Sequence, residues 1–182
     1  MRFPGWIMAL AVVPALACHG SDGAGSDTVG GEEIRVLSQE VSDCGGFSAM
    51  ADDLAPYCDA EVLLWAFDPV AGSLSLTDRR VPLNCCGLHA MTVTGTGGVY
   101  SAIETDALPE NGMRCRCDCV FDFRVVASPI PVGLPITLSL VRDVADQDGY
   151  PKTVWTGTLD LSAGSGSVVI DASPVLMGCN AL

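Results

Sequence analysis

Cationic residues are scarce in this chain, and their scarcity restricts the partners that it could bind. Nine lysines and arginines stand against 22 aspartates and glutamates, which gives a formal charge of -13. Nucleic-acid phosphates and anionic lipid headgroups both attract basic surfaces, so we expect neither as an electrostatic partner. The excess of acid is most simply explained by solubility, with recruitment of a cation such as calcium as the alternative.

Catalytic motifs are lacking as well. The sequence contains no Gly-x-Ser-x-Gly, no His-Glu-x-x-His and no phosphate-binding glycine loop. Of its two histidines only His89 lies beyond residue 31, so a hydrolytic triad or a Cys86–His89 dyad would depend on it. Cysteines around His89 are more simply explained as oxidised. We therefore expect no enzyme and no cofactor.

An apolar run long enough to cross a membrane is also missing. The segment Phe3 to Ala17 is uncharged and mostly apolar, but a spanning helix needs about 20 residues. Its position after Arg2 and its small terminal residue fit the hydrophobic region of a signal peptide. Pro4 and Pro14 argue against a buried helix. Residues 1–17 are therefore predicted to be a signal peptide.

The junction Ala17-Cys18 resembles the lipobox of bacterial lipoproteins, where a small residue precedes a cysteine that is lipidated and becomes the mature N-terminus. Ala15 departs from the leucine usual at its position, and cleavage nearby by an ordinary signal peptidase is the alternative. The resemblance implies a lipid anchor, with palmitate, on Cys18. Because His19 and not aspartate follows, it also implies the outer membrane. Residues 18–31 are rich in Gly, Ser and Asp and predict a flexible tether.

Cysteine, in contrast, is abundant. Nine are present, and lipidation of Cys18 would leave eight. An even number in an exported chain predicts a disulfide framework. The candidates are Cys44, Cys58, Cys85, Cys86, Cys115, Cys117, Cys119 and Cys179.

Short β-rich runs, separated by Gly, Pro, Asn and Asp, recur through residues 32–182. Only Ser48 to Leu54 has a brief helical pattern, and Glu61 to Phe67 is apolar enough for burial on both faces. About eight or nine strands at this spacing predict an all-β fold, a single β-sandwich of immunoglobulin-like or similar type. The expected strands are Glu33 to Val41, Glu61 to Phe67, Ser73 to Thr77, Leu88 to Thr94, Val99 to Thr105, Arg114 to Val126, Pro135 to Val141, Val154 to Leu161 and Ser167 to Asp171.

Two pairs of these runs are expected to be neighbours. Leu88 to Thr94 and Val99 to Thr105 flank a glycine-rich turn and predict a hairpin. Pro135 to Val141 and Val154 to Leu161 are expected to pair across the turn at residues 146–149. Asp143, Asp146 and Asp148 resemble part of a calcium loop, but the acids that complete such a loop are missing, so a hairpin turn is the better explanation.

The run Arg114 to Val126 separates its side chains cleanly under strand alternation. One face would carry charge, including Asp122, and would meet water. The other would carry Cys115, Cys117 and Cys119 together with Phe121, Phe123 and Val125, and is predicted to be buried in the core.

Same-face neighbours on a strand lie about 6.5–7 Å apart, too far for an easy disulfide. The three strand cysteines should therefore pair elsewhere, and Asn84-Cys85-Cys86-Gly87 is the obvious supplier of two partners. Cys44 and Cys58 bracket a short loop and are candidates to pair with each other. Cys179 would tie down the last segment.

A metal site is the competing interpretation of the same residues. Five thiols and an imidazole would suit zinc or Cu(I), but an oxidising compartment would compete for the thiolates. The residues are Cys85, Cys86, His89, Cys115, Cys117 and Cys119.

The motifs Asn84-Cys85-Cys86 and Cys115-x-Cys117-x-Cys119-x-Phe121-Asp122 are similar to those of uncharacterised cysteine-rich exported lipoproteins. That resemblance implies no activity. By elimination, we expect a membrane-anchored binding or structural surface module with a protein or carbohydrate ligand. An exported metal-binding protein is the alternative.

Overall fold

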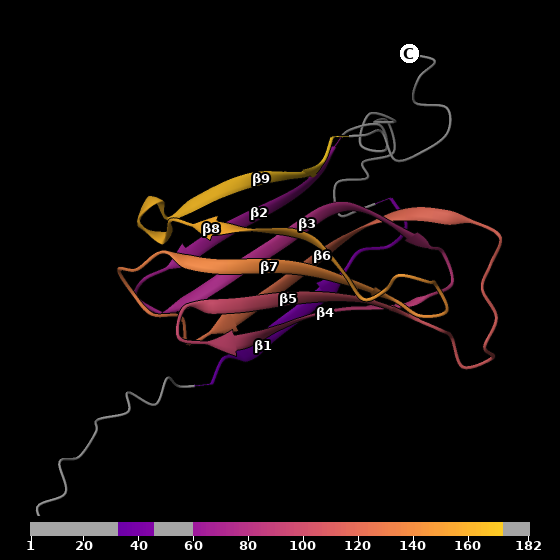
Figure 1. Cartoon of the computed structure of the whole chain (residues 1–182), viewed down its shortest axis with the longest axis horizontal. Coiled ribbons are helices and arrows are strands. Elements are labelled where there is room, and N and C mark those ends of the chain that lie inside the picture. Colours follow the sequence, from indigo (N-terminus) through magenta and orange to yellow (C-terminus); the bar gives the residue numbers. More distant parts are fainter. Residues whose placement is uncertain (1–32, 46–59, 173–182) are drawn as a thin grey trace, which may run out of the picture. The chain divides into compact units, whose positions relative to one another are not determined.

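The computed structural model describes residues 33–45 and 60–172, which form an all-β domain of two packed sheets (Figure 1). The expectation of eight or nine strands in a sandwich is confirmed. The strands are β1 (Arg35–Val41), β2 (Glu61–Asp68), β3 (Ser73–Asn84), β4 (Leu88–Thr96), β5 (Val99–Ala107), β6 (Asp118–Ser128), β7 (Ile136–Val144), β8 (Lys152–Leu159) and β9 (Ser165–Asp171).

One sheet has five strands in the order β1-β6-β3-β2-β9, and the other has four in the order β4-β5-β7-β8. Neighbouring strands are antiparallel except β5 and β7, which are parallel. The chain enters the other sheet after β3, β5, β6 and β8. A short 3-10 turn, Leu161–Ala163, makes the last of these connections.

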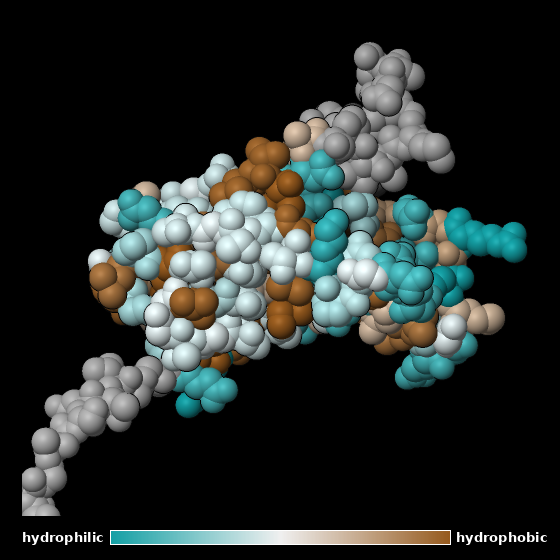
Figure 2. All heavy atoms as spheres, in the orientation of Figure 1, coloured by the Kyte–Doolittle hydropathy of each residue, from teal (hydrophilic) through white to brown (hydrophobic). Residues whose placement is uncertain are grey.

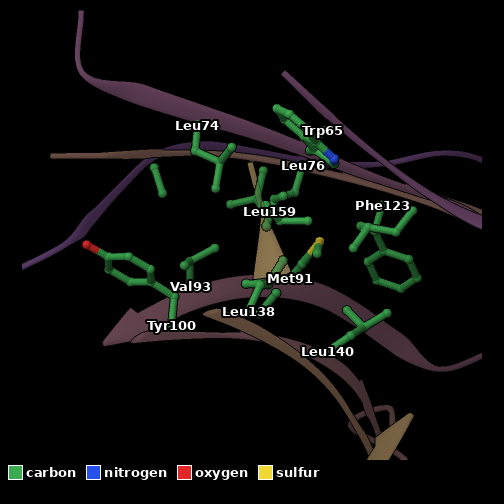
Figure 3. Close-up of a cluster of buried hydrophobic side chains, with 14 of the residues drawn as sticks. Trp65, Leu74, Leu76, Met91, Val93, Tyr100, Phe123, Leu138, Leu140 and Leu159 are labelled. Atoms are coloured by element: carbon green, nitrogen blue, oxygen red, sulfur yellow. The ribbon is translucent and has the colours of Figure 1, made fainter. Parts of the chain in front are cut away.

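The core lies between the sheets because strands β2, β3, β5 and β7 bury alternate side chains. Strand β7 alternates without a break, from buried Ile136 to buried Val144. In Figure 3, Leu74 and Leu76 from the five-stranded sheet face Val93, Tyr100 and Leu138 from the four-stranded sheet. Burial of apolar surface on this scale is the main stabilising term of such a fold.

Both predicted hairpin pairs are confirmed. Strands β4 and β5 pair in full register, and β7 pairs with β8. The first hairpin needs glycine at position 95. Gly95 has φ of 126°, and a Cβ on it would lie 2.2 Å from the carbonyl oxygen of Val99. A larger residue would push the strands apart at the turn.

Three sequence expectations need correction. The predicted strand over Arg114 to Val126 begins only at Asp118, and β3 continues well past Thr77 to Asn84. Strand β2 buries alternate residues instead of both faces. The brief helix expected over Ser48 to Leu54 lies outside the described residues.

Asp122 is buried, although alternation placed it in water. The cause is a bulge in β3, where the register with β6 shifts between Asp78 and Val81. Arg80 takes φ of 67° there, and its backbone N–H donates to the Asp122 carboxylate at 2.9 Å. A buried acceptor at this point is explained by the extra donor that the bulge exposes.

Candidate functional site: the disulfide-capped end of the sandwich

Three disulfides join segments that are distant in sequence. Cys85 is bonded to Cys117 and Cys86 to Cys115, with Cα–Cα distances of 5.7 and 5.5 Å. The expectation that the segment from Asn84 to Gly87 supplies two partners is thereby confirmed. Both bridges hold the connection between β5 and β6 against the turn between β3 and β4.

The third bridge corrects an expectation. Cys44, which follows β1, is bonded to Cys119 at the start of β6, with a Cα–Cα distance of 5.6 Å. The pairing of Cys44 with Cys58 is therefore wrong. Cys58 and Cys179 lie outside the described residues.

The three cysteines do not share one buried face, as the alternation had predicted. Cys119 is 2% exposed, whereas Cys115 is half-buried and Cys117 is exposed. The reason is that β6 begins after Cys117, so the two earlier cysteines belong to an irregular segment at the end of the sandwich.

Asn84 organises that irregular segment. Its side-chain amide donates to the carbonyl oxygens of Cys115 and Cys117 at 2.8 and 3.0 Å. Its side-chain oxygen accepts from the backbone N–H groups of Cys86 and Cys115 at 3.1 and 3.3 Å. One side chain thus contacts the backbone of three of the four cysteines in the two neighbouring disulfides. The sequence marked Asn84 only as part of the Asn-Cys-Cys motif.

Arg114 fastens the same segment to the four-stranded sheet. Its guanidinium forms an ion pair with Asp106 and donates to the carbonyl oxygens of Asp106 and Ala145, both at 2.9 Å. It also contacts Asp146 at 3.0 Å. Asp146 lies in the predicted hairpin turn between β7 and β8, so Arg114 connects this turn to the disulfide-bonded segment.

His89 lies beneath this ion pair on the core side of β4. Its side chain is 7% exposed, and its Nε2 lies 3.4 Å from the Asp106 carboxylate. Its ring centroid lies 4.2 Å from that of Phe121. Burial lowers the pKa of His89 and outweighs the opposing effect of Asp106, so the neutral ring is favoured. His89 therefore packs in the core and is not an exposed general base.

A second charged cluster bridges the two sheets at the same end. Arg142 of β7 contacts Glu104 of β5 at 2.9 Å and Glu61 of β2 at 2.8 Å. Its Nη2 also lies 3.8 Å from Asp78 of β3. All four side chains are at most 9% exposed. Nothing in the sequence pattern beyond charge at core positions signalled this cluster.

One guanidinium cannot neutralise three carboxylates, and two of these carboxyl groups, Asp78 and Glu61, have raised pKa values. Burial raises the pKa of Asp78 well above its usual range, and the neighbouring Glu104 carboxylate raises it further. Burial also raises the pKa of Glu61, against the opposing charge of Arg142. Both oxygens of Asp78 and one of Glu104 lack a hydrogen-bond partner within the described residues. A proton on Asp78 gives that side chain a donor for Glu104 and reduces the excess negative charge.

The cysteines of the metal interpretation are all bonded to one another or to Cys44, so they offer no thiolates. Among residues 33–45 and 60–172, no group of three or more His, Cys, Asp or Glu side chains is placed to hold a metal ion. The alternative of a Cys/His cluster therefore does not fit this arrangement.

The outer face of the five-stranded sheet carries an open depression of about 560 Å³. Its lining includes the exposed pair of Arg124 and Glu40, 3.9 Å apart, and Arg79, which lies 3.7 Å from the buried Asp122. The other lining residues are Leu64, Trp65, Ala66, Ser75 and Thr77.

The outer face of the four-stranded sheet is different, because it carries no charge over three complete rows. These positions alternate with the buried residues of their strands and point away from the core. We call these twelve residues the hydroxyl face, since nine of them are serine or threonine. The rows are Thr96, Val99, Thr137 and Thr158, then Thr94, Ser101, Ser139 and Thr156, and then Thr92, Ile103, Val141 and Thr153.

Comparison with protein-family models, with curated proteins and with solved structures found no match for this chain. Within the described part of the chain, no helix has the length and apolar character needed to span a membrane. The fold and the disulfides define a disulfide-rich β-sandwich domain of a kind suited to an oxidising, exported environment.

Proposed function

We propose that this chain is an exported lipoprotein, held at the outer membrane by a lipid on Cys18, whose β-sandwich acts as a binding or structural surface module. The observation that carries the proposal is the set of three disulfides among the described residues. Such bridges persist in oxidising compartments and are rare where glutathione keeps thiols reduced. A signal peptide over residues 1–17 would deliver the chain to such a compartment.

The proposed lipid anchor and the proposed tether would have separate roles. The anchor would hold the chain at the membrane, and the Gly/Ser/Asp-rich residues 18–31 would let the domain reach away from it. The chain's formal charge of -13 would favour solubility and disfavour contact with anionic headgroups. The ligand we propose is a protein or a carbohydrate, and the depression beside Arg124 and Glu40 is where it would bind.

We propose no catalytic role. Cys86, the thiol that would form a dyad with His89, is bonded to Cys115. The carboxyl groups with raised pKa values, Asp78 and Glu61, are buried between the sheets and are no more than 2% exposed. Their environment supports a role in holding the sheets together.

Anchoring is tested with Cys18→Ser in a bacterial host that processes lipoproteins. The wild-type chain is expected in the membrane fraction and should incorporate labelled palmitate. The variant should incorporate none and should leave the membrane fraction. Ser21→Ala, a change in the proposed tether, serves as the matched control and should behave as wild type. Unchanged membrane association and labelling of Cys18→Ser would rule out the anchor.

A further inference from the structure

We propose that the hydroxyl face binds the same face of a second copy of this chain and forms a weak, reversible homodimer. This inference goes beyond the proposed function and does not depend on the lipid anchor. It gives the module one structural role, which is self-association through the four-stranded sheet. The depression on the five-stranded sheet stays free for another ligand.

The first observation is the missing charge. Charged residues make up 17% of this chain and are mostly exposed, so twelve solvent-facing positions would hold about two or more. The hydroxyl face has none. In Figure 2 the surface over β5 and β7 is mostly white with separate brown patches, and teal gathers toward the ends. Solubility does not explain the missing charge, because a strongly acidic chain could place carboxylates on this face as well.

The five-stranded sheet provides an internal comparison. Its outer face includes Glu40 and Arg124 in one cross-strand row, and Arg79 and Asp122 line the same depression. The outer faces of the two sheets therefore differ in their content of charged residues. The difference singles out the four-stranded face as the one from which charge is excluded.

The chemistry of the face is self-complementary. A serine or threonine hydroxyl both donates and accepts, so a hydroxyl surface can pair with a copy of itself. A two-fold axis brings the same patch of each subunit together, which makes such pairing the ordinary geometry of a dimer. Along the middle row, Thr94, Ser101, Ser139 and Thr156 already lie side by side, with the last two hydroxyls 3.1 Å apart.

The net charge favours this face over others for self-association. Two copies with a formal charge of -13 each repel, and burying an uncompensated carboxylate in an interface is costly. Contact through an uncharged face avoids that desolvation. It leaves only long-range repulsion, which salt screens over about 8–10 Å. Association should therefore strengthen as ionic strength rises.

The area of the face sets the expected strength. Its three rows across four strands cover about 19 Å by 20 Å, or about 380 Å², at the usual strand spacing and rise. A stable interface takes about 600–1,000 Å² from each partner. The face is smaller than this, so the dimer should be weak, with a dissociation constant in the micromolar range or above.

Sedimentation velocity over a concentration series tests the proposal. The exported, oxidised chain is used in a density-matched mild detergent that keeps any attached lipid soluble. We compare wild type with Ser139→Asp at the centre of the hydroxyl face and with Ser75→Asp on the outer face of the five-stranded sheet. Both serines are half-buried and lie on strands with two neighbours, so the two changes are matched.

Wild type and Ser75→Asp should associate reversibly and more tightly at higher salt, while Ser139→Asp should associate at least about tenfold more weakly. Thermal unfolding of each variant checks the fold, and Thr94→Asp, at an exposed position of the same row, replaces Ser139→Asp if that variant is unfolded. A wild-type chain that stays monomeric at every concentration and salt overturns the proposal. Equal weakening by Ser75→Asp also overturns it. Binding of a monomeric wild type to neutral polysaccharide, lost in Ser139→Asp, would assign the face to a glycan instead.

Discussion

Arg142 of the four-stranded sheet donates two hydrogen bonds to the two carboxylate oxygens of Glu61 of the five-stranded sheet, at 2.8 and 3.3 Å. The pair joins the sheets at their polar end, where the apolar core gives way to Glu104 and Asp78. A bidentate arginine–carboxylate pair is geometrically specific as well as strong. The arrangement therefore fixes how the two sheets lie against each other, and its removal should be measurable as stability.

Arg142→Met is expected to destabilise the domain by about 3–5 kcal/mol, because it leaves buried carboxylates without their cation. Urea unfolding at neutral pH measures the effect. Arg124→Met provides the control, since Arg124 and Glu40 form an exposed pair 3.9 Å apart, and such pairs contribute about 0–1 kcal/mol. Similar losses in both variants would show that the buried cluster has no special role.

Stability should also fall as pH rises, because Asp78 has a raised pKa in the folded domain. Between the ordinary carboxyl pKa of the unfolded chain and the raised pKa of the fold, the folded state holds a proton that the unfolded state has lost. Rising pH in that window therefore favours unfolding. Below the ordinary carboxyl pKa this penalty is absent. Glu61, whose pKa is also raised, acts in the same direction, and Glu104 and Arg142 face both groups.

Asp78→Asn is the variant that tests this pH dependence. It keeps the side chain neutral at all pH values and gives it a donor toward Glu104. Urea midpoints measured from mildly acidic to mildly alkaline pH should decline less steeply than in wild type, with a residual slope from Glu61. Asp118→Asn, at an exposed position, should keep the wild-type slope. An unchanged slope in Asp78→Asn would mean that Asp78 is ionised in the fold.

The strands and hairpins were predictable because their signals are local. Alternation along β7 and the glycine turn between β4 and β5 each lie within a few residues. Long-range partners have no such signal. Cys44 lies 75 residues before Cys119, so a short loop to Cys58 looked like the simpler closure. The Arg142–Glu61 contact spans 81 residues and is invisible to any periodicity.

The first four residues of the run Arg114 to Val126 lie outside β6 for a physical reason. Alternation of Arg114, Cys115, Arg116 and Cys117 imitates a strand, but two disulfides, the Asn84 side chain and the Arg114 ion pair together hold this segment outside the sheet. Covalent and polar contacts thus override an otherwise clear pattern. Asp122 shows the same limit, because only the bulge at Arg80 explains its burial.

Cys117→Ser should lower thermal stability and leave one titratable thiol on Cys85. The bridge closes a separation of 32 residues, and loss of a native disulfide of this kind typically costs about 2–4 kcal/mol. Thiol titration of the native protein and a thermal scan provide the two readouts. The double variant Cys85→Ser, Cys117→Ser should be about as destabilised but should gain no thiol. A Cys117→Ser protein without a new thiol would show that Cys85 has another partner.

Asn84→Asp should destabilise the disulfide-capped end even though its shape is unchanged. The side-chain amide of Asn84 donates to two carbonyl oxygens, those of Cys115 and Cys117. An aspartate would instead place a carboxylate oxygen against both carbonyls. The carbonyl oxygen of Cys115 would lose the Asn84 donor, and that of Cys117 would keep only the backbone N–H of Cys85, at a cost of about 1–3 kcal/mol. Asn111→Asp is the matched control, because Asn111 uses only its side-chain oxygen, which accepts from the N–H of Met113 at 3.0 Å. Aspartate preserves that bond, so urea unfolding should show a loss for position 84 and little change for position 111. Equal stability of the two variants would contradict the role given to Asn84 at the disulfide-capped end.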